Sequence, residues 1–97
     1  MDLQGFYEVL SADTNEIKIC LASKEHPIFK AHFPENPILP GFIHLEIIEK
    51  EFNFQISQIK KAKLNEIITP HAIMRYVREK NKFQVFINNK QVASFLL

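Results

Sequence analysis

The sequence predicts a single α+β domain in which an antiparallel sheet curls around one helix. Its 97 residues suit one compact domain, residues 1–97. Several segments have the residue pattern that is typical of strands, whereas only one segment has a clear helical period. A proline-rich stretch separates the first two strand-like segments from the helical one. Strands that come in runs, without regular alternation with helices, favour an antiparallel sheet with the helix packed on it.

The chain opens with a predicted β-hairpin. Residues 6–10 are expected to form the first strand, and residues 16–22 alternate well enough to form the returning one. Between them, residues 11–15 are a cluster of turn-forming Ser, Asp, Thr and Asn. The two segments are therefore expected to pair as neighbours in the sheet.

The next stretch, residues 27–40, holds four of the five prolines. Because proline fixes φ and lacks an N–H, we expect neither a regular helix nor a central strand here. Aromatic and aliphatic side chains recur within the stretch, so it is expected to be an ordered loop. Gly41, one of only two glycines, ends that loop.

Residues 42–52 form the predicted helix. Leu45, Ile48 and Phe52 recur at spacings of three and four, and they are expected to share one apolar face with Gly41. Further apolar residues in the same segment widen this surface. A helix that is apolar over so much of its circumference is expected to be enclosed by a sheet.

The remaining chain is predicted to supply about four strands. Three of them are residues 56–64, 72–78 and 83–87, and residues 91–97 form the last. A hairpin turn is expected at residues 88–90, because both asparagines of Asn-Asn-Lys tolerate a positive φ.

Composition narrows the class of protein. A hydrophobic content of 46% argues against a disordered chain. Cys20 is the single cysteine, which fits a reducing compartment, and we interpret it as a small strand residue. The sequence has neither a run of about 20 apolar residues nor a signal segment, so a soluble, cytoplasmic protein is expected. A domain this small gains from burial at a dimer interface.

Charge is divided unevenly along the chain. Residues 1–53 hold nine acidic and four basic side chains, whereas residues 54–97 hold eight basic and two acidic ones. Such asymmetry can attract an acidic partner, or the two halves can neutralise each other within the fold or across a dimer. Both interpretations stay open. No nucleic-acid-binding motif accompanies the basic half, so nucleic-acid binding is not expected.

The most informative segment is residues 32–46, His-Phe-Pro-Glu-Asn-Pro-Ile-Leu-Pro-Gly-Phe-Ile-His-Leu-Glu. Its pattern of His-Phe-Pro, spaced prolines, Pro-Gly and a later Glu resembles the signature of the 3-hydroxyacyl-[acyl carrier protein] dehydratases. In that family a loop histidine precedes the central helix, and the helix carries the acid fourteen residues later. His32 and Glu46 have this separation. Weaker similarity continues through residues 68–70 and the closing strand pair, and the resemblance implies a hotdog fold of the short, minimal form.

The residue types suit the chemistry of dehydration. A neutral imidazole can accept the weakly acidic C2 proton of a 3-hydroxyacyl thioester. A carboxylic acid kept neutral by apolar surroundings can protonate the departing hydroxyl. The free N–H groups and dipole of a helix N-terminus can stabilise the thioester oxyanion. By resemblance, His32 is the base, Glu46 is the acid and the backbone N–H of Gly41 is the oxyanion donor.

The resemblance also implies partners and a pathway. In the family, the His and Glu of one site come from different subunits, so a homodimer or a higher oligomer of dimers is implied. The substrate would be an acyl chain on the phosphopantetheine arm of acyl carrier protein, lying in a tunnel at that interface. The product would be a 2-enoyl thioester, in fatty-acid or in specialised acyl or polyene synthesis. No cofactor and no metal are implied.

Two departures keep alternative functions open. Glu35 stands where a glycine commonly follows His-Phe-Pro, and residues 47–50 replace the family's small residues and glutamine. A non-catalytic hotdog subunit that binds acyl carrier protein, one half of a heteromer, and a hotdog acyl thioesterase are therefore alternatives.

The other histidines and the basic residues have structural interpretations beside functional ones. His44 has no family counterpart and is expected to be a polar edge residue or, as the alternative, a neighbour of the substrate tunnel. His26 and His71 are expected at the surface, and a metal site is not expected. Seven basic residues could dock the acidic carrier or line solvated strand edges: Lys60, Lys61, Lys63, Arg75, Arg78, Lys80 and Lys82.

Overall fold

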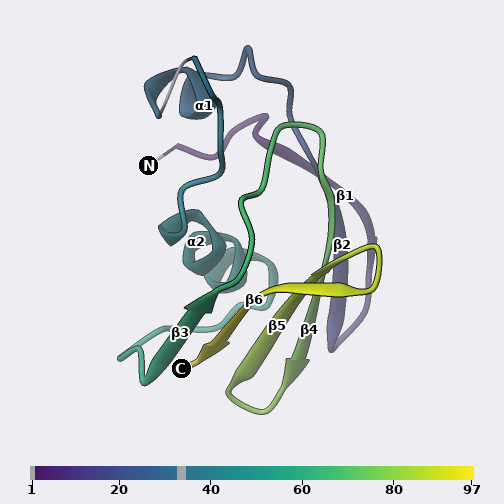
Figure 1. Ribbon diagram of the computed structural model, residues 1–97. Coiled ribbons are helices and arrows are strands. Elements are labelled where there is room, and N and C mark those ends of the chain that lie inside the picture. The colour runs from purple at the N-terminus through teal and green to yellow at the C-terminus, as the bar shows by residue number, and fades with distance from the viewer. Residues whose placement is uncertain (1, 33–34) are drawn as a thin grey trace.

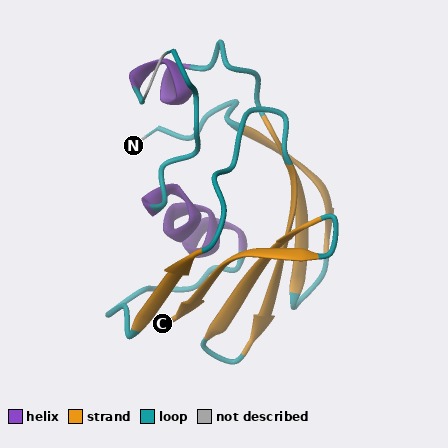
Figure 2. Cartoon of the chain, viewed as in Figure 1, coloured by secondary structure: helices purple, strands orange, loops and turns teal. Residues whose placement is uncertain are grey.

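A computed structural model describes residues 2–32 and 35–97 of the chain. Within these residues lie six strands and two helices (Figures 1 and 2). In chain order they are β1 (Tyr7–Ala12), β2 (Glu16–Leu21), α1 (Pro27–Ala31), α2 (Phe42–Glu51), β3 (Lys61–Leu64), β4 (Ile73–Glu79), β5 (Lys82–Ile87) and β6 (Lys90–Leu96).

All six strands form one antiparallel sheet in the order β1-β2-β4-β5-β6-β3. The sheet curves, and α2 lies on its concave side, while α1 lies near one end of the molecule (Figure 1). The predicted α+β class, an antiparallel sheet with a packed helix, is therefore confirmed. β1 and β3 are the two edge strands.

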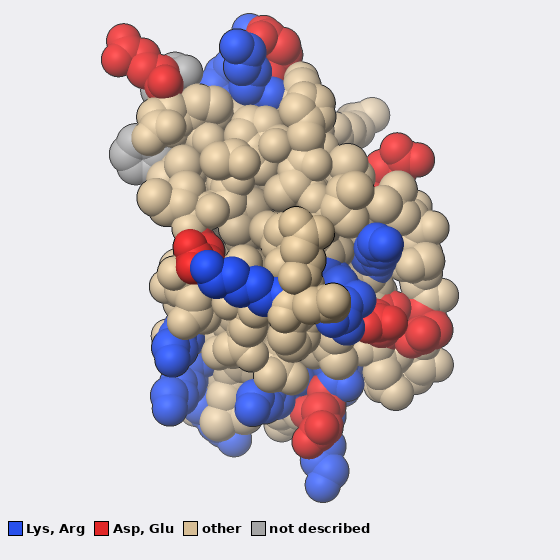
Figure 3. Space-filling view, turned by 45° about the vertical axis from the view of Figure 1, so that its right-hand side comes forward, with Lys and Arg blue, Asp and Glu red and all other residues tan. Residues whose placement is uncertain are grey.

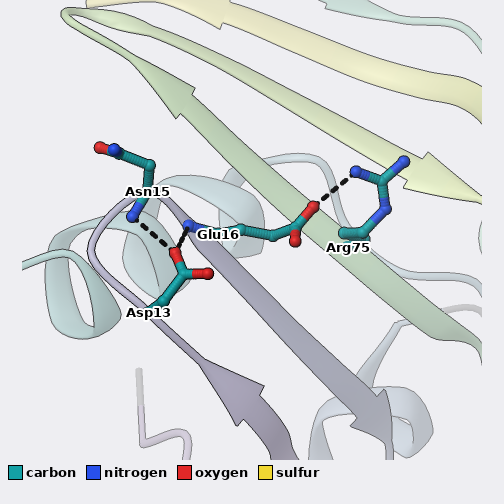
Figure 4. Close-up of polar contacts among 4 residues, drawn as sticks. All are labelled: Asp13, Asn15, Glu16 and Arg75. Carbon is teal, nitrogen blue, oxygen red and sulfur yellow. Dashed lines mark hydrogen bonds and ion pairs between the residues drawn. The ribbon is translucent and has the colours of Figure 1, made fainter.

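The predicted hairpin at the start of the chain is present. The carboxylate of Asp13 accepts hydrogen bonds from the backbone N–H groups of Asn15 and Glu16, each at 2.9 Å, which closes the turn (Figure 4). Glu16 in turn accepts a hydrogen bond from Arg75 at 2.6 Å, which ties β2 to β4. The last hairpin is also as predicted, because Asn88 and Asn89 have φ values of 50° and 64° between β5 and β6.

The face of α2 that packs on the sheet differs from the predicted one. The buried residues are Ile43, His44, Ile47 and Ile48. Of the predicted set, Ile48 is fully buried, whereas Leu45, Phe52 and Gly41 are only partly buried. A helix that is apolar over much of its circumference offers more than one possible face, and only the position of the sheet decides between them.

Two predicted elements need correction. The prediction that residues 27–40 contain no regular helix was wrong, because α1 begins at Pro27. Proline is tolerated at the first helical position, where its missing N–H would have no partner within the helix. The strand predicted at residues 56–64 is limited to β3, since only residues 61–64 lie opposite β6.

The core lies between α2 and the sheet. Met74 and Tyr76 of β4 and Phe83 of β5 are fully buried there. Phe83 contacts the ring of Phe52, the residue that follows α2, with ring centroids 5.3 Å apart. Along the described chain, neither helix has the length and apolar character needed to cross a membrane.

Candidate active site

His32 is held by the short helix α1. It is the residue that ends this helix, and its backbone N–H donates a hydrogen bond to the carbonyl of Phe29 at 3.3 Å. Its side-chain Nδ1 lies 2.8 Å from the carbonyl oxygen of Ile28. Because a carbonyl oxygen can only accept, Nδ1 must carry the proton. The neutral ring then has its lone pair on Nε2, the tautomer that a proton acceptor requires.

The ring of His32 lies beside the start of α2. Its centroid is 6.0 Å from that of Phe42, at an interplanar angle of 64°. Phe42 is the first residue of α2, so the loop brings the histidine to the N-terminus of this helix. The two other residues of the His-Phe-Pro motif, Phe33 and Pro34, lie outside the described residues.

Gly41 is the residue that caps the N-terminus of α2. Its φ of −57° and ψ of −36° are helical, so this position does not need glycine for its backbone angles. A Cβ added here would lie 2.5 Å from Cδ1 of Leu64, the last residue of β3. Glycine thus lets the edge strand approach the start of the helix. The first N–H groups of a helix lack partners within it and lie at the positive end of its dipole.

Glu46 lies on α2 one turn after Phe42. The spacing of four residues puts the two side chains on the same side of the helix. Glu46 is half-buried, and its Oε2 atom is shielded from solvent. The structure therefore brings His32 to Phe42 and carries Glu46 on the following turn. The three predicted site residues, His32, Gly41 and Glu46, therefore lie around the first turns of α2.

The expectation that His44 is a polar edge residue was wrong. Only 2% of its surface is exposed, and its Nδ1 lies 2.6 Å from the hydroxyl of Tyr76 on β4. Its ring also contacts Phe95 of β6, with centroids 5.6 Å apart. Burial lowers the pKa of His44 to about 4, and burial also raises the pKa of Tyr76. A neutral histidine thus joins the helix to the sheet from inside the core.

A second polar contact joins the other end of α2 to the sheet. The hydroxyl of Tyr7 on β1 donates a hydrogen bond to the carboxylate of Glu51. Burial, together with this hydrogen bond and the nearby negative charge, raises the pKa of Tyr7. Neither contact was predicted, because each pairs residues more than thirty positions apart and no local pattern marks them.

The other predicted candidates have structural positions. His26 accepts a hydrogen bond from the N–H of Ile28 at 3.1 Å and thereby caps α1. His71 is exposed, as expected, with a φ of 66°. Within residues 2–32 and 35–97, no group of three His, Cys, Asp or Glu side chains is arranged to hold a metal ion. A cavity of about 470 Å³ borders the loop that leads from His32 to Gly41, and it is lined by residues 23–25, 36–37 and 69–71.

The curved antiparallel sheet with one packed helix, together with a match to a family model, identifies the chain as a member of a hotdog-type dehydratase family. The family model of the ApeI-like proteins, described as ApeI dehydratase, matches residues 9–95. The chain belongs to this family.

Solved structures share the fold. One is the dehydratase heterocomplex ApeI:P from Xenorhabdus doucetiae, with a TM-score of 0.64 and 16% identity over 91% of this chain and 89% of that one. Another is an uncharacterized protein from Erwinia carotovora subsp. atroseptica, with a TM-score of 0.56 and 17% identity over 91% and 86% of the two chains. No curated protein matches the sequence significantly.

Proposed function

We propose that the chain dehydrates 3-hydroxyacyl thioesters carried on acyl carrier protein to 2-enoyl thioesters, in fatty-acid or specialised acyl synthesis. The observation that carries the proposal is the hydrogen bond between His32 Nδ1 and the Ile28 carbonyl at 2.8 Å. It gives His32 the tautomer of a general base at the N-terminus of α2. Membership of a dehydratase family supports the reaction class.

In the proposed reaction, Nε2 of His32 takes the proton from C2 of the substrate, and that electron pair becomes the C2–C3 double bond. Glu46 gives its proton to the hydroxyl on C3, which leaves as water. Negative charge that builds on the thioester oxygen is stabilised by the backbone N–H of Gly41 and by the helix dipole. After one turnover, His32 carries the proton from the substrate and Glu46 has lost its own to the departing water. Transfer of one proton from His32 to Glu46 restores the site.

We further propose that a second subunit completes the hotdog arrangement around α2 and the site. Large apolar side chains are exposed close to the start of this helix. Phe42 is 45% exposed, Leu64 58% and Ile67 69%. Exposed apolar groups gathered in one region mark interaction surfaces. In a homodimer, His32 of one copy would then face Glu46 of the other, with the phosphopantetheine arm between the subunits.

The test is hydration of a 2-enoyl thioester, followed by loss of the enoyl absorbance. We expect His32→Ala to lower the rate by roughly two to four orders of magnitude, as removal of a general base does. His71→Asn is the matched control, because His71 is exposed and asparagine tolerates its positive φ. Equal rates for wild type and His32→Ala would refute the assignment. Release of free thiol in place of hydration would identify a thioesterase.

The second candidate is a subunit of a heteromer whose site a different hotdog chain completes. It is favoured by the similarity to a structure described as a dehydratase heterocomplex. It is also favoured by Glu35, an exposed acid in the loop after His32. Mass measurement of the purified chain separates the candidates. A homodimer with full hydration activity would rule the heteromer out, whereas an inactive chain that gains activity with a second hotdog protein would establish it.

A further inference from the structure

Basic side chains of β5 and β3 flank β6 on the outer face of the sheet. Leu96 of β6 lies between Lys82 of β5 and Lys61 of β3 in the strand register. Ser94, two residues earlier, lies opposite Lys63. Residues paired across antiparallel strands point to the same face. The intervening Phe95 is buried, so the row that contains the lysines faces away from the core.

These residues line a hollow of about 330 Å³, which we name the basic groove. It is lined by Lys61, Lys63, Lys82, Gln91, Ser94, Phe95 and Leu96. No acidic residue is among those that line it. The ion pairs formed between described residues involve none of these three lysines. Lys and Arg side chains gather at the lower left of the molecule, at the height of β3 (Figure 3).

The groove has a shape that suits one kind of partner. Neighbouring strands lie about 4.8 Å apart, so the backbones that carry Lys61 and Lys82 are about 10 Å apart. Between them lies Leu96, which is 40% exposed. An α-helix with its side chains is about 10–12 Å wide. An amphipathic acidic helix could therefore place an apolar side chain on Leu96 and carboxylates beside the lysines on each side.

The groove is also connected to the candidate active site. Strand β3, which carries Lys61 and Lys63, ends at Leu64. The side chain of Leu64 occupies the space beside Gly41 at the start of α2. A partner bound along β3 would thus sit next to the site, with the edge of one strand between them. Lysines on an edge strand also discourage edge-to-edge pairing, but this does not account for Lys82, because β5 is an interior strand.

We propose that the basic groove docks an acidic amphipathic helix of the acyl carrier protein that delivers the thioester. This inference rests on the proposed function for the identity of the partner. Attraction between the groove and the carrier speeds encounter and weakens as salt rises, since the Debye length is about 10 Å at 0.1 M. The thioester arm then passes the end of β3 to reach Gly41.

The test compares carrier-bound and small substrates. The groove variant is Lys61→Glu with Lys82→Glu, and Lys61→Gln with Lys82→Gln is the milder version should reversal disturb folding. The control is Lys18→Glu with Lys24→Glu, two exposed lysines that give the same change in net charge outside the groove. Each protein is assayed for binding of holo acyl carrier protein and for turnover of carrier-bound and N-acetylcysteamine 2-enoyl thioesters.

We expect the groove variant to lose at least about tenfold in affinity for the carrier, with unchanged turnover of the small thioester and no loss in the control. Equal losses in groove and control variants, or no loss in either, would overturn the inference. A matching fall with the small thioester would overturn it too. If wild type binds the carrier through the groove yet hydrates neither thioester, the docking surface stands and the proposed reaction fails.

Discussion

The buried pair formed by His44 and Tyr76 predicts how stability depends on pH. Burial lowers the pKa of His44 in the folded chain to about 4, against 6.5 for the unperturbed group. Between these values the unfolded chain binds more protons at this position than the folded chain does. The contribution of the buried, neutral His44 to the free energy of unfolding is therefore present in full above pH 6.5 and is lost as pH falls toward 4.

The size of the effect follows from the same two values. Each pKa unit corresponds to about 1.4 kcal/mol, so a shift of this size corresponds to about 3 kcal/mol of unfolding free energy. A small domain has roughly 5–15 kcal/mol in total. Protonation of one core histidine would therefore remove a substantial share of the stability.

The comparison that isolates this contribution uses the double variant His44→Leu with Tyr76→Phe. Replacing both partners by apolar groups of similar shape avoids leaving either one buried without a hydrogen bond. The chain has no tryptophan, so urea unfolding is followed by far-ultraviolet circular dichroism at several pH values and one protein concentration. Other groups titrate in the same range, and the difference between wild type and variant removes their common contribution.

We expect the loss of unfolding free energy between pH 6.5 and 4 to be about 3 kcal/mol smaller in the double variant than in wild type. His71→Asn, which removes an exposed histidine, should follow the wild-type curve. Parallel curves for wild type and the double variant would refute the reasoning, because they would mean that His44 takes up its proton without penalty in the folded chain.

Two further predictions concern local geometry. Gly41→Ala should change the free energy of unfolding by no more than about 1 kcal/mol, since the backbone is already helical and the Leu64 methyl group that must move ends an exposed side chain. Urea denaturation checks this, and a much larger loss would mean that Leu64 is held rigidly. Asp13→Ala should lower stability by roughly 1 kcal/mol, because two turn hydrogen bonds are lost. Thermal unfolding beside Glu8→Ala, which removes an exposed carboxylate from β1, would show it, and equal midpoints for the two variants would contradict it.

The sequence was most informative where local chemistry decides the structure. The period of residues 42–52 located α2 to within one residue, and the Asn88-Asn89 pair marked its turn because asparagine tolerates a positive φ. His32 lies beside Phe42 at the start of α2 and Glu46 lies one turn further along, while the joint role of the two residues stays a prediction.

The features that sequence reasoning missed depend on distant partners. The burial of His44 requires Tyr76, which lies thirty-two positions away on β4. The choice of the buried face of α2 was likewise made by the sheet and not by the helix pattern. Helix α1 was missed for a different reason, since Pro27 was interpreted as a breaker when it occupies the one helical position that suits proline.

The attachment of His32 to α1 has a consequence for how this chain tolerates change. A helix of five residues has almost no stability of its own. It is anchored by the fully buried Phe29, whose ring lies 5.1 Å from that of Phe6. The orientation of the imidazole, which bonds to the Ile28 carbonyl, thus depends on the aromatic packing that holds α1 in place. Substitutions at positions 6 and 29 can therefore change the orientation of the His32 imidazole while every residue from His32 to Glu46 stays the same.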